Sequence, residues 1–238
     1  MEITQFEDRL FGCKAALLDV DGTLVDGSVS EGIGKGYLTR EWERGNYRNA
    51  ARGLLGALKT VFYTKLMGDE QRAYEEFAAA LNRVGCVDSE SASRFAEAYV
   101  KKHGLPYASD FVKFLNGVGM TTIAYTGGID VSARAASERF GTIAHLGNYS
   151  VFGSEIAPNV WSHVPGRKPN KRLTAEKFLD KRFGLKLNDC LVVGDAETDP
   201  GVMAGAKLSL AAPLAKPDVR AAADFWALSY EALLKALD

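Results

Sequence analysis

The sequence has few cysteines, and the three that it has are far apart. Cys13, Cys86 and Cys190 form no C-x-x-C pair and have no neighbouring histidine. Neither a disulfide framework nor a zinc site is therefore indicated. An odd number of widely spaced cysteines predicts reduced thiols in the protein core, as is typical of cytoplasmic proteins.

Long apolar segments are also missing. No segment approaches the roughly 18 uninterrupted apolar residues that a membrane-spanning helix requires. Residues 1–10 contain acidic and polar side chains where a signal peptide needs a basic start and an apolar run. We therefore expect a soluble, cytoplasmic protein without a membrane partner.

Charge of either sign is not in excess. The 29 basic and 30 acidic residues give a formal net charge of −1, which offers no bulk attraction to nucleic acid or to an anionic membrane. Any ability to bind phosphate must come from a local arrangement of side chains. The chain has 238 residues, of which 47% are hydrophobic, and it can form one core with a small accessory domain.

Three short apolar segments each end in a polar cluster. Residues 14–19 lead into DVDGT, residues 121–126 into two glycines, and residues 190–193 into Gly194 and Asp195. Helical patterns precede the second and third segments, and such alternation predicts an α/β protein with a Rossmann-like parallel sheet and helices on both faces. A further strand is expected at residues 208–211, a closing helix at 230–237, and two short strands between 142 and 156.

Between residues 26 and 106 the pattern is helical only. Large apolar residues recur every four positions in two runs, namely Leu54, Leu58, Phe62 and Leu66, and then Tyr74, Phe77, Leu81 and Val84. We predict an inserted all-helical cap domain at residues 27–105, with residues 1–26 and 106–238 forming the core domain. The glycines at its start predict a mobile connection: Gly27, Gly32, Gly34 and Gly36.

Acidic residues follow two of the predicted strands. Asp19 and Asp21 repel each other unless a cation neutralises them, and oxygen ligands favour Mg²⁺. Asp195 and Asp199 follow another buried strand and could complete the same oxygen site. Each pair by itself could instead cap backbone amides in a turn or a helix. Capping does not readily explain both pairs at one edge of a sheet.

Two further features suit phosphate. Thr126, Gly127 and Gly128 offer a hydroxyl and unhindered backbone N–H groups before a helix, an arrangement that favours anions, although a plain turn would also use these residues. Lys168 and Lys171 lie in the basic stretch GRKPNKR, where either could supply a point charge or simply be solvated.

The ordered segments DVDGT, TGG, a lysine near position 171 and GDAETD resemble the four motifs of the haloacid-dehalogenase-like (HAD) superfamily. The helical stretch lies between the first and second motifs, where that superfamily places a helical cap. Thr126-Gly127-Gly128 and the spacing after Asn170-Lys171 are similar to the phosphoserine-phosphatase-like branch. This spacing favours Lys171 over Lys168 as the motif lysine.

The resemblance implies a Mg²⁺-dependent phosphatase that acts on a small phosphorylated substrate. By this resemblance Asp19 is the nucleophile that forms an aspartyl-phosphate, and Asp21 is the general acid and base. The second acid at position 21 distinguishes phosphatases from the dehalogenases of the same superfamily.

The resemblance also implies the ligands of this site. Thr126, the Gly127 amide and Lys171 would hold the phosphoryl oxygens, with Gly128 beside them. The metal would be held by Asp19, the Asp21 backbone carbonyl and Asp195. Asp199 would be a further metal ligand or would contact one of these ligands.

Several alternatives remain open. Phosphoserine is one candidate substrate among several, because Glu31 lies further along than the acid that meets its amine, and Gly22 and Thr198 depart from that branch. A phosphotransferase or phosphomutase would use the same residues, and a domain that only binds its ligand is disfavoured because the motif residues are present. The oligomeric state stays open.

A nucleic-acid-end phosphatase would require a basic groove lined with aromatic side chains. Its only support is a stripe of arginines every four residues, with two aromatic residues between them: Arg40, Arg44, Arg48 and Arg52, with Trp42 and Tyr47. Interspersed acids favour a solvated helix face instead, so nucleic acid is disfavoured as a partner.

Overall fold

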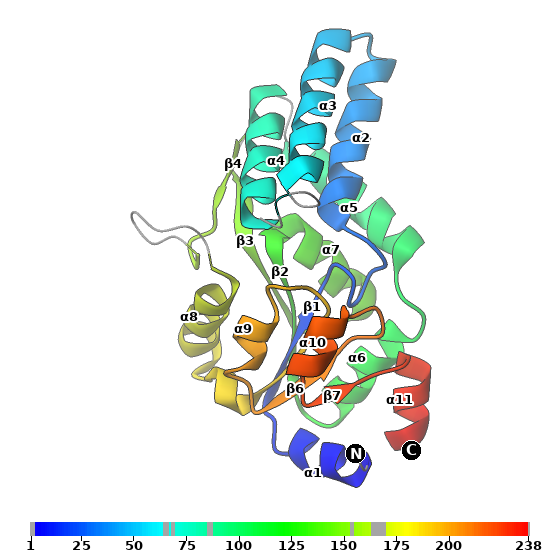
Figure 1. Cartoon of the computed structure of the whole chain (residues 1–238), viewed down its shortest axis with the longest axis vertical. Helices are drawn as coiled ribbons and strands as arrows, with labels where there is room; N and C mark the ends of the chain where they lie inside the picture. Colours follow the sequence, from blue (N-terminus) through cyan, green and yellow to red (C-terminus); the bar gives the residue numbers. More distant parts are fainter. Residues whose placement is uncertain are drawn as a thin grey trace.

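The computed structural model describes residues 3–63, 67, 70–84, 88–152, 155–162 and 170–237 (Figure 1). Leu66, Cys86 and Lys168 lie outside these residues. Among the helices of the described part, none combines the length and the apolar composition needed to cross a membrane.

A seven-stranded sheet in the order β4-β3-β2-β1-β5-β6-β7 forms the centre of the molecule. All neighbouring strands pair in parallel except β3 and β4, which are antiparallel at one edge. The strands are β1 (Ala15–Asp19), β2 (Thr121–Ile129), β3 (Ala144–Phe152), β4 (Glu155–Pro158), β5 (Cys190–Gly194), β6 (Leu208–Ala211) and β7 (Phe225–Trp226). The predicted parallel sheet is confirmed, and β7 is an additional short strand that the sequence pattern did not predict.

Helices cover both faces of the sheet, as predicted. Alternate residues of β1 face opposite layers: Ala16 and Leu18 belong to one apolar cluster, whereas Ala15 and Leu17 belong to the other. The first layer contains α1 (Ile3–Leu10), α6 (Ala108–Gly117), α7 (Asp130–Phe140) and α11 (Tyr230–Leu237). The second contains α8 (Lys171–Phe183), α9 (Pro200–Met203) and α10 (Pro217–Ala222).

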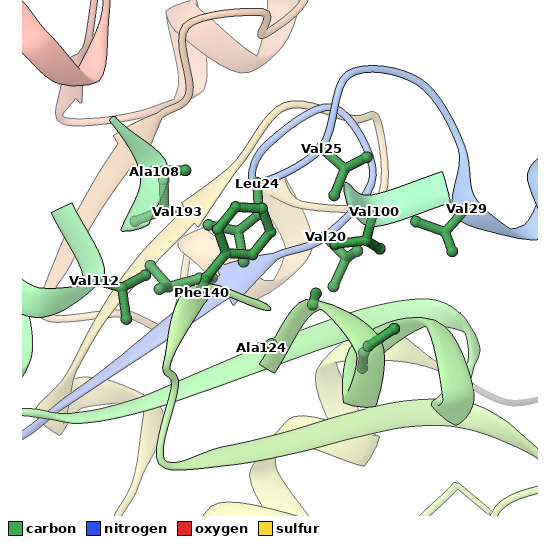
Figure 2. Packing of buried hydrophobic residues seen from close by; sticks show 14 of the residues in the cluster. Val20, Leu24, Val25, Val29, Val100, Ala108, Val112, Ala124, Phe140 and Val193 are labelled. Atoms are coloured by element: carbon green, nitrogen blue, oxygen red, sulfur yellow. The ribbon is translucent and has the colours of Figure 1, made fainter. Parts of the chain in front are cut away.

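The described residues between 29 and 103 form four further helices, which Figure 1 shows beyond the carboxyl ends of the central strands. They are α2 (Val29–Glu43), α3 (Tyr47–Val61), α4 (Glu70–Val84) and α5 (Ser89–His103). Helix α5 packs on α7 of the core. Figure 2 shows Val100 of α5 near Val20, Leu24 and Phe140. Helix α5 thus belongs to the predicted cap but packs on the core. The division into a core domain and a cap domain at residues 27–105 is a proposal.

The glycines at the start of the helical stretch do not form a mobile connection, so that interpretation was wrong. Gly32, Gly34 and Gly36 lie inside α2. A Cβ atom added at Gly32 would be 2.3 Å from the Tyr99 ring, and one at Gly36 would be 2.5 Å from the Phe95 ring. The glycines allow α5 to approach α2 closely. Gly27 alone of this group precedes the helix.

We expect Gly32→Ala to destabilise the protein although alanine is the better helix former. The clash with the Tyr99 ring should lower the free energy of unfolding by about 1–3 kcal/mol, more than the helix propensity gain of about 1 kcal/mol. Gly117→Ala in α6 is the control, because no atom lies within 4 Å of an added Cβ there and the change should stabilise. Urea unfolding of both variants measures the effect, and a stabilised Gly32→Ala protein would contradict this packing.

The arginine stripe is not continuous. Helix α2 ends at Glu43 with Arg44 as its C-cap, and α3 begins at Tyr47, so the four arginines belong to two helices. Arg40 donates a hydrogen bond to the Ser91 hydroxyl at 2.7 Å. Arg44 is exposed, as expected for a solvated face. The structure thus provides no aligned basic groove along these residues.

Candidate active site

Asp19 is the last residue of the central strand β1, and it lies almost completely buried beside two other carboxylates. Oxygen atoms of Asp19, Asp195 and Asp199 all lie within 4.8 Å of one another. The three acids come from the carboxyl ends of the adjacent strands β1 and β5 and from the loop that follows β5. Parallel pairing of the two strands therefore brings both acidic clusters together, as predicted.

Lys171 supplies the positive charge of this cluster. Its Nζ atom lies 2.5 Å from Oδ1 of Asp19 and 2.7 Å from Oδ1 of Asp199. The side chain of Asn170 accepts a hydrogen bond from the Leu173 amide at 3.1 Å, so Asn170 caps α8 and Lys171 is the first residue of the helix. The cap thereby fixes the point from which the lysine enters the site.

Asp199 is fully buried, and the chain itself occupies both of its oxygens. Oδ2 accepts hydrogen bonds from the amides of Asp195 and Ala196, each at 2.9 Å. Oδ1 accepts from Lys171 and, at 3.3 Å, from the Tyr125 hydroxyl. The Lys171 Nζ atom also lies 4.5 Å from the centre of the Tyr125 ring. Asp199 and Tyr125 thus hold the lysine and the loop after β5 in place.

Asp195 lies against the turn that follows β1. The Thr23 hydroxyl donates to Oδ1 of Asp195 at 3.1 Å. Gly22 has a φ of +76°, and a Cβ atom there would lie 2.0 Å from Oδ2 of Asp195. A larger residue would be strained at this φ and would have to displace the carboxylate, so glycine suits this turn. The buried Tyr230 hydroxyl donates to the Thr23 carbonyl at 3.0 Å, so the C-terminal helix α11 supports the same turn.

Asp21 points away from this cluster toward the start of α2. Its carboxylate accepts hydrogen bonds from the Val29 amide at 2.9 Å and from the Ser28 hydroxyl at 3.3 Å. Burial raises the pKa of Asp21 to about 6, and the Val29 hydrogen bond opposes that shift. The first predicted pair of acids is therefore divided between two positions, one in the cluster and one beneath the helical part.

The pKa values of Asp19 and Asp195 in the cluster are raised first by burial and then by the neighbouring carboxylates. Burial raises the pKa of Asp19 well above its usual range, although Lys171 opposes the shift. Burial, followed by the nearby Asp199, raises the pKa of Asp195 to about 7. Burial acts to lower the pKa of Lys171, but Asp19 and Asp199 outweigh it, so the pKa is raised. One ammonium group cannot balance three carboxylates, and their oxygens suit a divalent cation such as Mg²⁺.

Thr126, Gly127 and Gly128 lie at the end of β2, the other neighbour of β1. The nearly buried Thr126 hydroxyl accepts a hydrogen bond from the Gly128 amide at 3.0 Å. Pairing with β3 shifts register between Thr126 and Ile129, and a Cβ atom at Gly127 would meet nothing within 4 Å. A helix follows the glycines, as predicted: β2 ends at Ile129, which is the N-cap of α7, and α7 begins at Asp130.

Buried acids and a lysine at the carboxyl ends of central parallel strands define an α/β enzyme with its site at that edge of the sheet. The sequence profile of the haloacid dehalogenase-like hydrolase family matches residues 16–204. The chain belongs to this family. Among curated proteins, none matches this chain in sequence.

Solved structures with a similar fold include a substrate-bound phosphoserine phosphatase, with 19% identity and a TM-score of 0.62 over 94% of this chain and 97% of that one. A probable phosphoserine phosphatase from Vibrio cholerae has 16% identity and a TM-score of 0.63, over 95% of this chain and 65% of that one. A protein of unknown function from Bordetella pertussis Tohama I has 15% identity and a TM-score of 0.65, over 88% and 93% of the two chains.

The structure thus brings Asp19, Lys171, Asp195 and Asp199 into one cluster and places Asp21 next to it. Sequence reasoning missed two groups that contact the cluster, Thr23 and Tyr125. Thr23 lies within the DVDGT segment, so its polar side chain beside two acids was a usable signal. Tyr125 is a large residue in an apolar strand, and nothing in the strand pattern distinguishes it from a core residue.

Proposed function

We propose that the chain is a Mg²⁺-dependent phosphomonoester hydrolase that acts on a small phosphorylated metabolite through an aspartyl-phosphate on Asp19. The observation that carries this proposal is the buried contact of Lys171 with both Asp19 and Asp199, beside the Asp195 carboxylate. Membership of a hydrolase family and a fold similar to that of phosphoserine phosphatases support it.

In the proposed reaction a carboxylate oxygen of Asp19 attacks phosphorus, and the bond from phosphorus to the leaving oxygen breaks. Asp21 donates its proton to that oxygen. The Asp21 carboxylate then accepts a proton from water, whose oxygen attacks phosphorus and releases phosphate from Asp19. Such acid and base assistance typically contributes about 10²–10⁴ in rate.

The phosphoryl oxygens would be held by Thr126, the Gly127 amide and Lys171. The space over Gly127 and the interrupted pairing of β2 with β3 support this assignment, because they leave the strand end free for a ligand. The Gly128 amide already donates a hydrogen bond to the Thr126 hydroxyl. We therefore propose that Gly128 shapes this segment and does not bind phosphate directly. Lys171 would stabilise negative charge that spreads over these oxygens in the transition state.

Asp19, the Asp21 backbone carbonyl and Asp195 would hold Mg²⁺. When bound, the ion shields the Asp19 carboxylate from the negative charge of the phosphate. Because the oxygens of Asp199 are occupied by four donors of the chain, we assign Asp199 to positioning Lys171 and the loop after β5.

We also propose that residues 27–105 act as a cap that excludes water from the site. A cytoplasmic location remains a proposal. It is supported by Cys13 and Cys190, which are buried free thiols.

The metal requirement gives a direct test of the proposed activity. Hydrolysis of p-nitrophenyl phosphate should fall by about 10²–10³ after chelation, because a bound divalent ion contributes several kcal/mol to such reactions, and added Mg²⁺ should restore it. The same assay over a panel of small phosphomonoesters, with and without Mg²⁺, would reduce the number of candidate substrates. Full activity after exhaustive chelation would refute the magnesium assignment.

A further inference from the structure

A cavity of about 160 Å³ lies between α2, α3 and α4, outside the cluster of catalytic acids. Its walls are mainly apolar, and they come from all three helices. Residues that line it include Gly34 and Leu38 of α2, Gly53 and Ala57 of α3, and Phe77 and Ala80 of α4. The cavity is partly open to the surface, where the exposed residues Glu31 and Lys35 line it.

The cavity exists because α3 turns its small residues inward. The α3 residues that line the cavity include the small residues Gly53 and Ala57, whereas the large side chains of Leu55 and Leu58 are 62% and 59% exposed. One inward leucine on this helix would fill much of the space. The sequence instead places glycine and alanine on the face toward α2 and α4. The hollow is therefore encoded in the sequence of α3.

One end of the cavity lies in the first turn of α2, the helix whose first residue contacts Asp21. Helix α2 starts at Val29, whose amide donates to Asp21, and Glu31 in the first turn already lines the cavity. Glu41 lines it as well, ten residues further along α2. At 1.5 Å per residue these two positions are about 15 Å apart. The cavity thus extends from the neighbourhood of Asp21 away from the sheet.

We propose that this cavity binds an apolar substituent of the substrate, so that the enzyme acts on phosphate esters of amphiphilic alcohols. This inference rests on the proposed phosphatase function. A dry apolar cavity of about 150 Å³ is known to accept benzene, so the substituent has about six carbon atoms. Glu31 and Lys35, 3.8 Å apart, provide polar surroundings at the end near the site. The walls beyond them are mainly apolar, and the Glu41 carboxylate at the far end already accepts hydrogen bonds from Asn46 and Asn49.

The test is a series of n-alkyl phosphates from methyl to octyl. Burial of each methylene should raise kcat/KM about fourfold, so hexyl phosphate should exceed methyl phosphate by about 10²–10³. No further rise is expected once the cavity is full. Equal kcat/KM values for methyl and hexyl phosphate would overturn the proposal while leaving the phosphatase function intact.

Two alanines of α3 provide matched variants. Ala57→Leu fills the cavity and should remove most of the gain from chain length without changing methyl phosphate hydrolysis. Ala51→Leu makes the same substitution on the exposed face and should leave the gain unchanged. Thermal melting verifies folding, and Ala57→Met is a more adaptable replacement if Ala57→Leu unfolds. A chain-length gain that survives in the folded Ala57 variants would exclude this cavity as the binding site.

A failure of the proposed phosphatase function can be distinguished from a failure of the cavity proposal. If no alkyl phosphate is hydrolysed with Mg²⁺ present, calorimetry with methylphosphonate and hexylphosphonate tests the cavity without turnover. Tighter binding of hexylphosphonate that Ala57→Leu removes would support the cavity. Equal binding of the two phosphonates would overturn it.

Discussion

Asp19→Asn is expected to abolish phosphatase turnover, with a loss of at least about 10⁴ in kcat, because an amide oxygen cannot serve as the nucleophile. The substitution changes neither the size nor the shape of the side chain, and its oxygen can still accept a hydrogen bond from Lys171, which lies 2.5 Å from Asp19. The fold should therefore persist. Steady-state hydrolysis of p-nitrophenyl phosphate measures the loss.

Asp218→Asn is the control for this change, because Asp218 is exposed on α10 and contacts none of the cluster. It should retain normal activity. An Asp19→Asn protein with more than a few per cent of normal turnover, after contamination and deamidation are excluded by mass spectrometry, would mean that another group attacks phosphorus.

Lys171→Ala should reduce kcat by about 10²–10³, the usual effect of removing a group that stabilises transition-state charge. It should also destabilise the protein, because Asp19 and Asp199 would remain buried without their cation. Breaking a buried ion pair costs about 3–5 kcal/mol, and protonation of the acids would offset part of this. Kinetics with p-nitrophenyl phosphate and urea unfolding measure the two effects separately.

Lys168→Ala is the matched control, since both lysines lie in the same basic stretch. We expect it to retain most activity and stability. If Lys168→Ala lost more activity than Lys171→Ala, the motif lysine would have to be reassigned, although the nucleophile would not change.

Much of the core could be predicted because its strands are short, fully buried runs that end in polar residues. Residues 15–18 and 190–194 are buried throughout, as expected for central parallel strands covered on both faces. The acids that end these strands must then meet at one edge of the sheet. Local pattern and parallel topology together are therefore sufficient to place Asp19 near Asp195.

For residues 27–105 the sequence predicts the helices but not how they pack against one another. Leu54 and Leu58 recur with the period of a helix, yet both are exposed, and the small residues between them face α2 and α4. Periodicity indicates a face but not which partner covers it. In the same way, glycines suit either a flexible linker or close helix contact, and only the rings of Tyr99 and Phe95 show that Gly32 and Gly36 serve contact.

The hydrogen-bond partners of the site residues come from distant parts of the chain. Tyr125 reaches Asp199, which is 74 residues away in the chain, and Tyr230 supports Thr23 across 207 residues. No local pattern encodes such pairs. The occupied oxygens of Asp199 likewise became apparent only from the loop after β5, and they favour a positioning role over metal binding.

The central claim is that Asp19 carries the phosphoryl group and that Asp21 assists its arrival and release. Asp21→Asn should still accept phosphate from p-nitrophenyl phosphate, whose leaving group departs with little protonation, but should release it slowly. We therefore expect a phosphoryl adduct to accumulate on this variant.

Mass spectrometry of rapidly quenched protein, followed by peptide mapping, tests this claim most directly. The account predicts an adduct of one phosphoryl group on Asp19 in the Asp21→Asn variant, and no adduct in Asp19→Asn under the same conditions. A phosphorylated Asp19→Asn protein, or an adduct that maps to another residue of the Asp21→Asn protein, would contradict it.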